Sequence, residues 1–510
     1  MADLVIGSGP AGISVARALL ARGRTVELLD AGAEPEPEVQ DRLQEISGLS
    51  SDVLSDAARA AWMGPQFSAS DGEVRRYGSS FAMELGENTF AEGAKWFALR
   101  ASRALGGLSN YWGAAVLPYR QEDIDDWPVT AGDLAPHYQA VADWMPISGR
   151  GDDLARLFPA FSMATARAIA PTAQAEGLLS RLNQKAPVLA DMGVQAGMAR
   201  QAVDLSCRAC GLCLHGCPWS LIYSARHTCV SMRGTPHFSY QSGMVVRQIW
   251  EEGEGILVSL ADGRTHRGER VFLATGVLET ARILLASPGL ARDELILKDS
   301  QQAFLPMLHH WRSPRRPDSL PYQTLPQLFV ELDDPAISPR LIHAQIYTWN
   351  EYFARDLRQN YGRLPGMGPI LDSVSRRLIV AQAFLHSDLS ASVALSIAGD
   401  GRLIPRLINN PKTASTMHAA LGRYSRAFRQ LGLIGLPFAA RLGAPGSSFH
   451  MGGSLPMAET PGKGQSDLLG RPKGAARIHV VDASVFPSVP ATTITFSVMA
   501  NAHRIGTLAP

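Results

Sequence analysis

Four cysteines lie within eleven residues of one another: Cys207, Cys210, Cys213 and Cys217, with Pro218 directly after the last. The spacing C-x₂-C-x₂-C-x₃-C-P is the one that bacterial ferredoxins use for iron–sulfur ligation. Thiolates this close in a glycine-containing loop can converge on one cluster, whose potential the neighbouring N–H groups would tune. The run therefore predicts an iron–sulfur cluster, either 4Fe–4S on all four thiolates or 3Fe–4S on three of them.

Other uses of these cysteines stay open. Zinc is the main alternative, although structural zinc sites usually take their ligands from two pairs separated by a longer loop. Disulfide bonds are disfavoured because the spacings are very short and the chain shows no export signal. The fifth cysteine, Cys229, stands apart, and we expect it to be a small buried apolar residue.

A glycine turn near the amino terminus has the composition of a dinucleotide site. An apolar strand at 4–6 runs into Gly7, Gly9 and Gly12, an amphipathic helix follows, and a second strand ends in Asp30. The glycines permit a tight turn, a close approach of a pyrophosphate and a close helix–sheet contact, and the helix N-terminus favours phosphate. The carboxylate of Asp30 is placed to accept hydrogen bonds from ribose hydroxyls and disfavours NADP.

A histidine near the carboxyl end could do acid–base chemistry. His450 lies in a loop of small residues at 447–454, and a strand ending in Asp482 follows. A neutral imidazole, with a reference pKa of about 6.5, can take a proton from a hydroxyl group near neutral pH. The residues alone leave open whether His450 is a base or a structural histidine. A glycine-rich loop at 106–113 would let the backbone pass a flat ring system, or simply pack its tryptophan.

These residues need a framework that brings both ends of the chain together. The fold class is α/β, α+β overall: a Rossmann-like domain joined to a mostly antiparallel-sheet substrate domain. Strand patterns are expected at 304–311, 327–332, 341–349, 378–385, 392–398 and 478–482, and helices at 414–431 and 494–505. The nucleotide-binding domain is expected to comprise 1–145, 191–295 and 441–510, with the cysteine loop at 205–220. A helical insertion is expected at 146–190, and the substrate domain at 296–440.

Length and composition exclude several classes of protein. A chain of 510 residues is too long for one simple core, and its net charge of +1 gives no reason to expect a nucleic-acid partner. No apolar run is long enough for a membrane span. Because the first strand begins by residue 4, there is no room for a signal peptide, so we expect a cytoplasmic protein, with export alongside a partner subunit left open.

Taken together, these segments resemble the glucose–methanol–choline (GMC) flavoprotein oxidoreductases. The resemblance rests on the glycine turn, 106–113, 271–278, the His450 loop and 481–484. It implies bound FAD and a histidine that faces the reacting atom, here His450. The implied FAD contacts are Gly7, Gly9, Gly12 and Asp30 for the ADP half, Gly107, Ser109 and Asn110 along the flavin, and Asp482 and Ala483 near the pyrophosphate and ring.

The sequence departs from the family pattern at two positions. Where the family usually has a second His or Asn, this chain has Thr493, a weaker partner for a base. Either another residue such as His310 or His343 assists, or His450 acts alone. Where some family members attach FAD covalently through a histidine, this chain has Tyr111, so the resemblance implies non-covalent FAD.

The cysteine run adds a resemblance to the iron–sulfur-containing catalytic subunits of bacterial FAD-dependent sugar dehydrogenases. The three-cysteine spacing of those subunits fits Cys207, Cys213 and Cys217, which leaves Cys210 as an extra thiol. The resemblance implies oxidation of an alcohol or sugar, with electrons leaving through the cluster to a cytochrome, a ferredoxin or a small subunit. Two alternatives remain: a ferredoxin-fed reductase running in the opposite direction, and a non-catalytic zinc- or cluster-binding sensor or scaffold.

Overall fold

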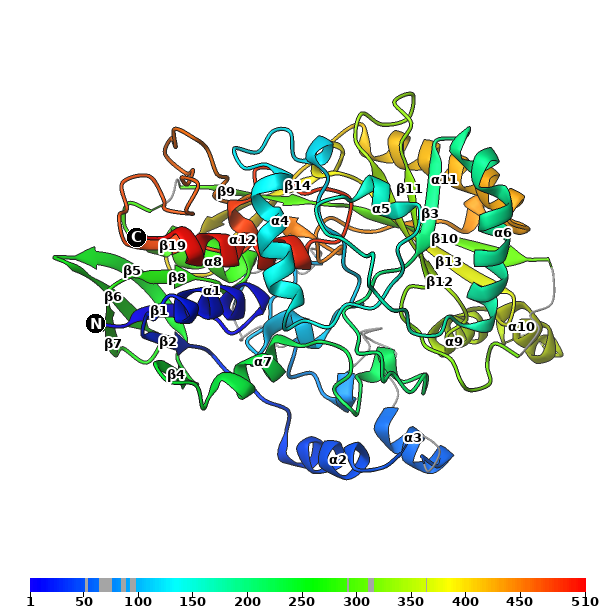
Figure 1. The fold of residues 1–510 in the computed structure, drawn as a ribbon, viewed down its shortest axis with the longest axis horizontal. Helices are drawn as coiled ribbons and strands as arrows, with labels where there is room; N and C mark the ends of the chain where they lie inside the picture. The colour runs from blue at the N-terminus through cyan, green and yellow to red at the C-terminus, as the bar shows by residue number, and fades with distance from the viewer. Residues whose placement is uncertain are drawn as a thin grey trace.

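The fold is that of a computed structural model, which describes residues 1–50, 54–63, 76–83, 89–91, 98–290, 293–310, 316–363 and 365–510. Two principal sheets occupy opposite ends of the molecule (Figure 1). Both chain termini lie at the end that contains β1, so the amino- and carboxyl-terminal segments meet in one structural unit.

A parallel sheet forms the nucleotide-binding end. In the described part of the chain it has five strands in the order β19-β8-β1-β2-β4. Its strands are β1 (Asp3–Ile6), β2 (Val26–Leu29), β4 (Phe238–Gln241), β8 (Val271–Leu273) and β19 (Ile478–Val480). The strands β1, β8 and β19 are fully buried, as the apolar strands of a parallel sheet covered on both faces must be. The predicted first two strands and the strand near 478 are confirmed.

Helices α1 (Pro10–Ala21) and α12 (Thr495–Leu508) pack closely against each other beside this sheet (Figure 1). Gly506 makes this possible, because a Cβ there would lie 2.9 Å from side-chain atoms of Val15 and Ala18. The last helix of the chain therefore stabilises the first, and the sequence predicted both.

A mostly antiparallel sheet forms the other end. Its strand order is β16-β10-β13-β12-β11-β3, with β17 also paired to β10. The strands are β3 (Val194–Met198), β10 (Gln302–His309), β11 (Leu328–Leu332), β12 (Ile342–Tyr347), β13 (Leu378–Phe384), β16 (Leu433–Gly435) and β17 (Arg441–Leu442). Helices α6 (Ala173–Ala190) and α11 (Thr413–Gln430) bury the apolar face of this sheet. The opposite face carries polar and aromatic side chains, among them Glu331, His343, Gln345, Gln382 and Phe384.

Three sequence expectations differ from the structure. Strand β3 was grouped with the nucleotide-binding residues, but it pairs with β11 at the edge of the antiparallel sheet. Strand β14 (Ser392–Ile397) was placed in the substrate sheet, but it lies in a separate sheet of order β15-β14-β9-β18. Within 146–190, only α5 (Leu154–Leu157) and α6 are helical. Apolar periodicity identified the strands but not their partners, because pairing depends on distant residues. The domain boundaries themselves stay a prediction.

The smaller elements complete the framework. A sheet of order β5-β6-β7 flanks the nucleotide-binding end. The remaining strands are β5 (Val246–Glu252), β6 (Gly255–Leu260), β7 (Thr265–Gly268), β9 (Leu295–Asp299), β15 (Leu403–Ile408) and β18 (Met451–Gly452). The remaining helices are α2 (Pro37–Ser47), α3 (Asp56–Met63), α4 (Ala131–Ala142), α7 (Ala225–Met232), α8 (Val277–Ala286), α9 (Glu351–Tyr361) and α10 (Met367–Ser375). None of the helices described here has the length and apolarity needed to span a membrane.

Candidate active site

A cavity opens at the carboxyl ends of β1, β2 and β8. Ligands of open α/β sheets usually bind at this edge. The lining comes from both ends of the chain, and among the predicted site residues it includes Gly7, Gly9, Asp30, Gly107, Asp482 and Ala483. The two neighbours of His450, Phe449 and Met451, also line it. The cavity thus runs from the predicted ADP contacts to the predicted catalytic loop.

The three glycines of the first turn serve two different purposes. Gly7 has a φ of +100°, and a Cβ there would lie 2.6 Å from the carbonyl oxygen of Ala274. A Cβ on Gly12 would lie 1.8 Å from the carbonyl oxygen of Gly7, so both residues are needed for close backbone packing. A Cβ on Gly9 would meet nothing within 4 Å, although Gly9 lines the cavity. The open space at Gly9 fits the approach of a pyrophosphate.

Asp30 lies at the end of β2 with only 7% of its surface exposed. Ser8 donates to its carboxylate from both the hydroxyl and the backbone N–H. Burial raises the pKa of Asp30 to about 6, while the bonds from Ser8 oppose that rise. The hydroxyl of Ser8 also accepts a hydrogen bond of 2.8 Å from the backbone N–H of Gly106. Ser8 therefore joins the glycine turn to the loop at 106–113, a role that the sequence did not suggest.

The loop at 106–113 faces the cavity with its backbone. Gly107 lines the cavity opposite Gly9, since a Cβ on Gly107 would lie 3.4 Å from the Cα of Gly9. Ser109 and Asn110, expected along the flavin, use their side chains within the protein. The Ser109 hydroxyl donates to the Gly106 carbonyl, and the Asn110 amide donates to the Leu105 and Gly107 carbonyls at 2.8 Å. These bonds stabilise the loop, so neither side chain is a cavity-lining group.

Asp482 follows β19 and is buried beside the start of α8. Its carboxylate accepts a hydrogen bond of 2.6 Å from the Thr280 hydroxyl and one of 2.9 Å from the backbone N–H of Ser484. Burial raises the pKa of Asp482, and these two donors oppose the rise. Asp482 and Ala483 line the same cavity as the glycine turn. Their predicted place near the pyrophosphate and ring stays a prediction.

The loop that carries His450 is anchored by Asp299, the last residue of β9. The Asp299 carboxylate accepts bonds from the Gly446 N–H (2.7 Å) and the Ser448 hydroxyl, and that hydroxyl accepts a 3.0 Å bond from the His450 N–H. Phe449 has a φ of +63°, a conformation that non-glycine residues rarely adopt. The anchor holds this strained residue in place, as is common at functional sites.

His450 is held as a neutral imidazole. Its ring stacks on Phe384 of β13, with centroids 4.9 Å apart and planes 19° apart. Burial, with a smaller contribution from the charge of His343, lowers the pKa of His450 to about 3. Its Nδ1 is enclosed and has no hydrogen-bond partner among the described residues. A neutral imidazole next to the cavity can accept a proton, which is what a base requires.

The three residues considered as helpers of His450 occupy different places. The Thr493 hydroxyl is buried and lacks a partner among the described residues, while Ile494 and Thr495 line the cavity. His343 lies close enough to His450 to affect its pKa. His310 lies at the far end of β10, where its Nδ1 is 2.7 Å from the Gly432 carbonyl oxygen. Thr493 and His343 therefore remain candidates, and no described contact connects His310 with the site.

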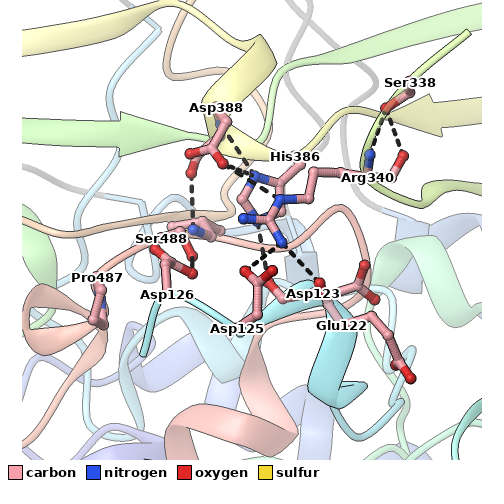
Figure 2. A network of polar contacts seen from close by, with 12 residues as sticks. Glu122, Asp123, Asp125, Asp126, Ser338, Arg340, His386, Asp388, Pro487 and Ser488 are labelled. Atoms are coloured by element: carbon pink, nitrogen blue, oxygen red, sulfur yellow. Dashed lines mark hydrogen bonds and ion pairs between the residues drawn. The ribbon is translucent and has the colours of Figure 1, made fainter. Parts of the chain in front are cut away.

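A polar network fixes the segment that leads into the Thr493 turn (Figure 2). The Ser488 hydroxyl donates to Asp126 at 2.8 Å, and Trp127 donates to Ser488 at 2.9 Å. Arg340 donates to Asp125 at 2.6 Å and lies 3.5 Å from the carboxylate of Asp388. The network joins residues before β12, residues after β13 and the carboxyl-terminal segment. The turn at 490–494 is thereby tied to the antiparallel sheet.

The four cysteines of the 207–217 run are free thiols in one loop. Burial is the main reason that the pKa of Cys207 rises to about 11 and that of Cys210 to about 12, and the neighbouring thiols of Cys213 and Cys217 contribute to both values. The thiols are thus near neighbours. Nevertheless, no group of three or more Cys, His, Asp or Glu side chains in the described residues is arranged to hold a metal ion. The donor chemistry fits an iron–sulfur cluster, but the side-chain positions do not.

One buried arginine connects the cysteine loop with the loop at 106–113. Arg76 donates to the carbonyl oxygen of Cys213 and, at 3.2 Å, to that of Trp112. Its guanidinium carbon also lies 5.3 Å from the ring centroid of Tyr111. The cysteine loop and the cavity-lining loop are thus separated at this point by a single guanidinium group. Nothing in the sequence indicated this role for Arg76, because its partners come from distant segments.

Comparison with known proteins agrees with the fold. Residues 402–502 match the family model described as GMC oxidoreductase. The fold is similar to the crystal structure of pyridoxine 4-oxidase from Mesorbium loti, with a TM-score of 0.57 and 17% sequence identity over 99% of this chain and 98% of that one. A search of curated proteins found no match.

The carboxyl-terminal part of the chain, residues 402–502, thus carries a GMC oxidoreductase domain. This match and the shared fold agree with the resemblance to the GMC oxidoreductases seen in the sequence. The glycine turn fits FAD, because Gly9 lines the cavity and no protein atom lies within 4 Å of the position that a Cβ on Gly9 would take. The iron–sulfur part of the resemblance has no such support.

Proposed function

We propose that this protein oxidises the hydroxyl group of an alcohol or sugar, with His450 as the base. The observation that carries the proposal is a neutral imidazole in a strained, anchored loop whose two flanking residues line the FAD cavity. Gly7, Gly9, Gly12 and Asp30 would hold the ADP half of non-covalent FAD. Such a site meets the requirements for oxidation of a CH–OH group.

Oxidation of the alcohol removes a proton from the hydroxyl oxygen and a hydride from the carbinol carbon. His450 takes the proton from the substrate hydroxyl, and the C–O bond becomes a carbonyl as the carbinol carbon loses its hydride. When bound, FAD supplies the acceptor for that hydride. The buried, unpartnered hydroxyl of Thr493 can donate a hydrogen bond to the substrate oxygen. The low pKa of His450 leaves the base unprotonated before substrate arrives.

We further propose that electrons leave through an iron–sulfur cluster on Cys207, Cys210, Cys213 and Cys217. The spacing of the run supports this route, although the described side chains are not arranged around a metal ion. The contact of Arg76 with Cys213 and with the loop at 106–113 supports a short path between the two sites. The external acceptor would be a cytochrome, a ferredoxin or a small subunit.

Anaerobic absorption spectroscopy tests the reaction. Alcohols, sugars and pyridoxine, the substrate named for the similar enzyme, are added separately to the holoprotein. We expect at least one of them to bleach the oxidised flavin band in the wild type and to bleach it far more slowly in His450→Asn. If none does while reduced ferredoxin does, the enzyme works as a reductase and the proposal is wrong.

Iron and acid-labile sulfide measured in anaerobically purified protein test the electron route. Iron with sulfide is the expected result. Zinc, or no metal, would refute the cluster and leave the oxidation chemistry untouched.

A further inference from the structure

The face of the antiparallel sheet that α6 and α11 leave uncovered carries a row of amide and aromatic side chains. On β10, β13 and β12, this row consists of Phe304, Gln382 and Gln345, each directly opposite the next. Because opposed residues project to the same face, the three side chains share it. Phe304 and Gln382 are partly exposed, whereas Gln345 is buried, with 4% of its surface exposed.

The residues on either side of this row contact the two loops of the candidate active site. Phe384, two residues after Gln382 on β13, stacks on His450. On the other side, the Tyr347 hydroxyl would lie 3.5 Å from a Cβ on Gly113, so β12 approaches the loop at the flavin side there. Two residues along a strand span about 6.6 Å. A substrate the size of a monosaccharide is therefore long enough to contact both His450 and the amides.

Hydrogen bonds within this face fix the orientation of both amides. Tyr347 donates to Oε1 of Gln345 at 2.9 Å, so Nε2 of Gln345 is left as a donor. Gln382 donates from Nε2 to Oε1 of Gln302, so its own Oε1 is left as an acceptor. Gln302 in turn donates at 2.9 Å to the carbonyl of Ser447, in the loop of the proposed base. Among the described residues, neither the free donor nor the free acceptor has a partner.

We propose that Gln345 and Gln382 bind neighbouring hydroxyl groups of an uncharged sugar or polyol, beside the hydroxyl that His450 deprotonates. This inference rests on the proposed function. A hydroxyl group both donates and accepts, so two neighbouring hydroxyls match one free donor and one free acceptor on adjacent strands. The rings of Phe304 and Tyr347 offer apolar surface for the C–H groups of such a substrate.

The charges near this face are already paired or occupied. On the described strands β3 and β10 to β13, the face carries Glu331 and His343, which lie 2.8 Å apart and have exposed fractions of 1% and 0%. Arg76, which contacts the neighbouring loop, is buried and donates to two carbonyl oxygens. A carboxylate or an ammonium group bound at the amides would lose hydration without gaining an opposite charge. The face therefore favours an uncharged substrate.

Calorimetry with the anaerobically reduced holoprotein measures binding without turnover, because the flavin then cannot accept a hydride. The probes are glucose, galactose, sorbitol and inositol, compared with gluconate, glucosamine and 1-butanol. We expect at least one neutral sugar or polyol to bind at least tenfold more tightly than each of the three comparison compounds. In Gln345→Leu and in Gln382→Leu, its Kd and its KM should rise about five- to a hundredfold, with a smaller change in kcat.

Gln195→Leu is the matched control, because Gln195 is an amide on the same face but lies on β3, opposite Glu331. This variant should leave the Kd unchanged. Gln382→Glu keeps the shape of the side chain and should shift the binding preference toward glucosamine. The wild-type comparison and this variant give a result even where a leucine variant fails to fold.

Three results would overturn the inference: a wild type that prefers gluconate, glucosamine or 1-butanol, a wild type that binds none of the neutral compounds, or an unchanged Kd in both Gln345→Leu and Gln382→Leu. Tight binding of a neutral sugar or polyol with no reduction of the flavin by any compound would support the inference and refute the proposed function. The two failures are therefore distinguishable.

Discussion

Replacement of Gly9 by alanine tests where the cofactor's phosphates lie. Gly9 has φ −65° and ψ 179°, an extended conformation that alanine adopts without strain. The new methyl group would meet no protein atom within 4 Å, yet it would project into the cavity. The substitution should therefore leave the folded apoprotein intact and obstruct only a bound ligand.

The size of the effect follows from this geometry. We expect FAD affinity to fall between about tenfold and a hundredfold, which corresponds to about 1.4–2.8 kcal/mol. The apoprotein should lose no stability and could gain about 0.5 kcal/mol, because alanine restricts the unfolded chain more than glycine does. A decrease in affinity with no decrease in apoprotein stability is the signature of a ligand contact.

The matched control is Gly12→Ala, three residues further along the same turn. Its Cβ would lie 1.8 Å from the carbonyl oxygen of Gly7, so this variant should destabilise the apoprotein itself. Thermal unfolding of the two apoproteins and fluorescence titration with FAD separate the outcomes. Wild-type FAD affinity in Gly9→Ala would refute the placement of the pyrophosphate at this turn.

Three further predictions address the base, its anchor and the cysteine loop. In His450→Asn, kcat should fall about 10²- to 10⁴-fold while the bound FAD measured by absorbance is unchanged; a loss below tenfold would contradict the role of the base. Burial raises the pKa of Asp299 from 3.8 to about 6, so the folded chain binds a proton at this carboxylate more tightly than the unfolded chain does. Protonation of Asp299 therefore stabilises the folded state as the pH falls through 6. Between pH 7 and 5, the free energy of unfolding measured with urea should therefore rise by about 1 kcal/mol more in the wild type than in Asp299→Asn. The same pH dependence in both proteins would contradict this. In Cys213→Ser, iron content and electron transfer to a one-electron acceptor should fall while alcohol-driven flavin reduction continues; unchanged iron content would argue against this ligand.

The nucleotide-binding end was predictable because its signals are local. The strand, glycine turn, helix, strand and Asp30 follow one another within the first thirty residues, and each has a physical task that its residue type reveals. The last helix was equally clear from its apolar spacing. In the antiparallel sheet, β10 to β13 were identified from their sequence patterns, but β3 was not predicted as a strand and β14 was placed in the wrong sheet. Their pairing depends on β11 and β9, which are far away in the sequence.

The residues that support the site could hardly be predicted from the sequence. Asp299 is a single acid at the end of a strand, and only the folded chain brings it to Ser448. Ser8 was within the recognised turn, but its bonds to Asp30 and Gly106 depend on two other segments. Phe384 is an ordinary aromatic residue of a buried strand until His450 stacks on it. Motifs identify groups that do chemistry, whereas the groups that orient them come from tertiary contacts.

Anaerobic mixing of the FAD-loaded protein with a panel of alcohols and sugars, followed by absorbance, tests the central claim most directly. The account predicts that at least one compound reduces the flavin rapidly in the wild type and at least a hundredfold more slowly in His450→Asn, which retains the same FAD content. Equal rates in the two proteins, or a flavin that no alcohol or sugar reduces, would contradict it.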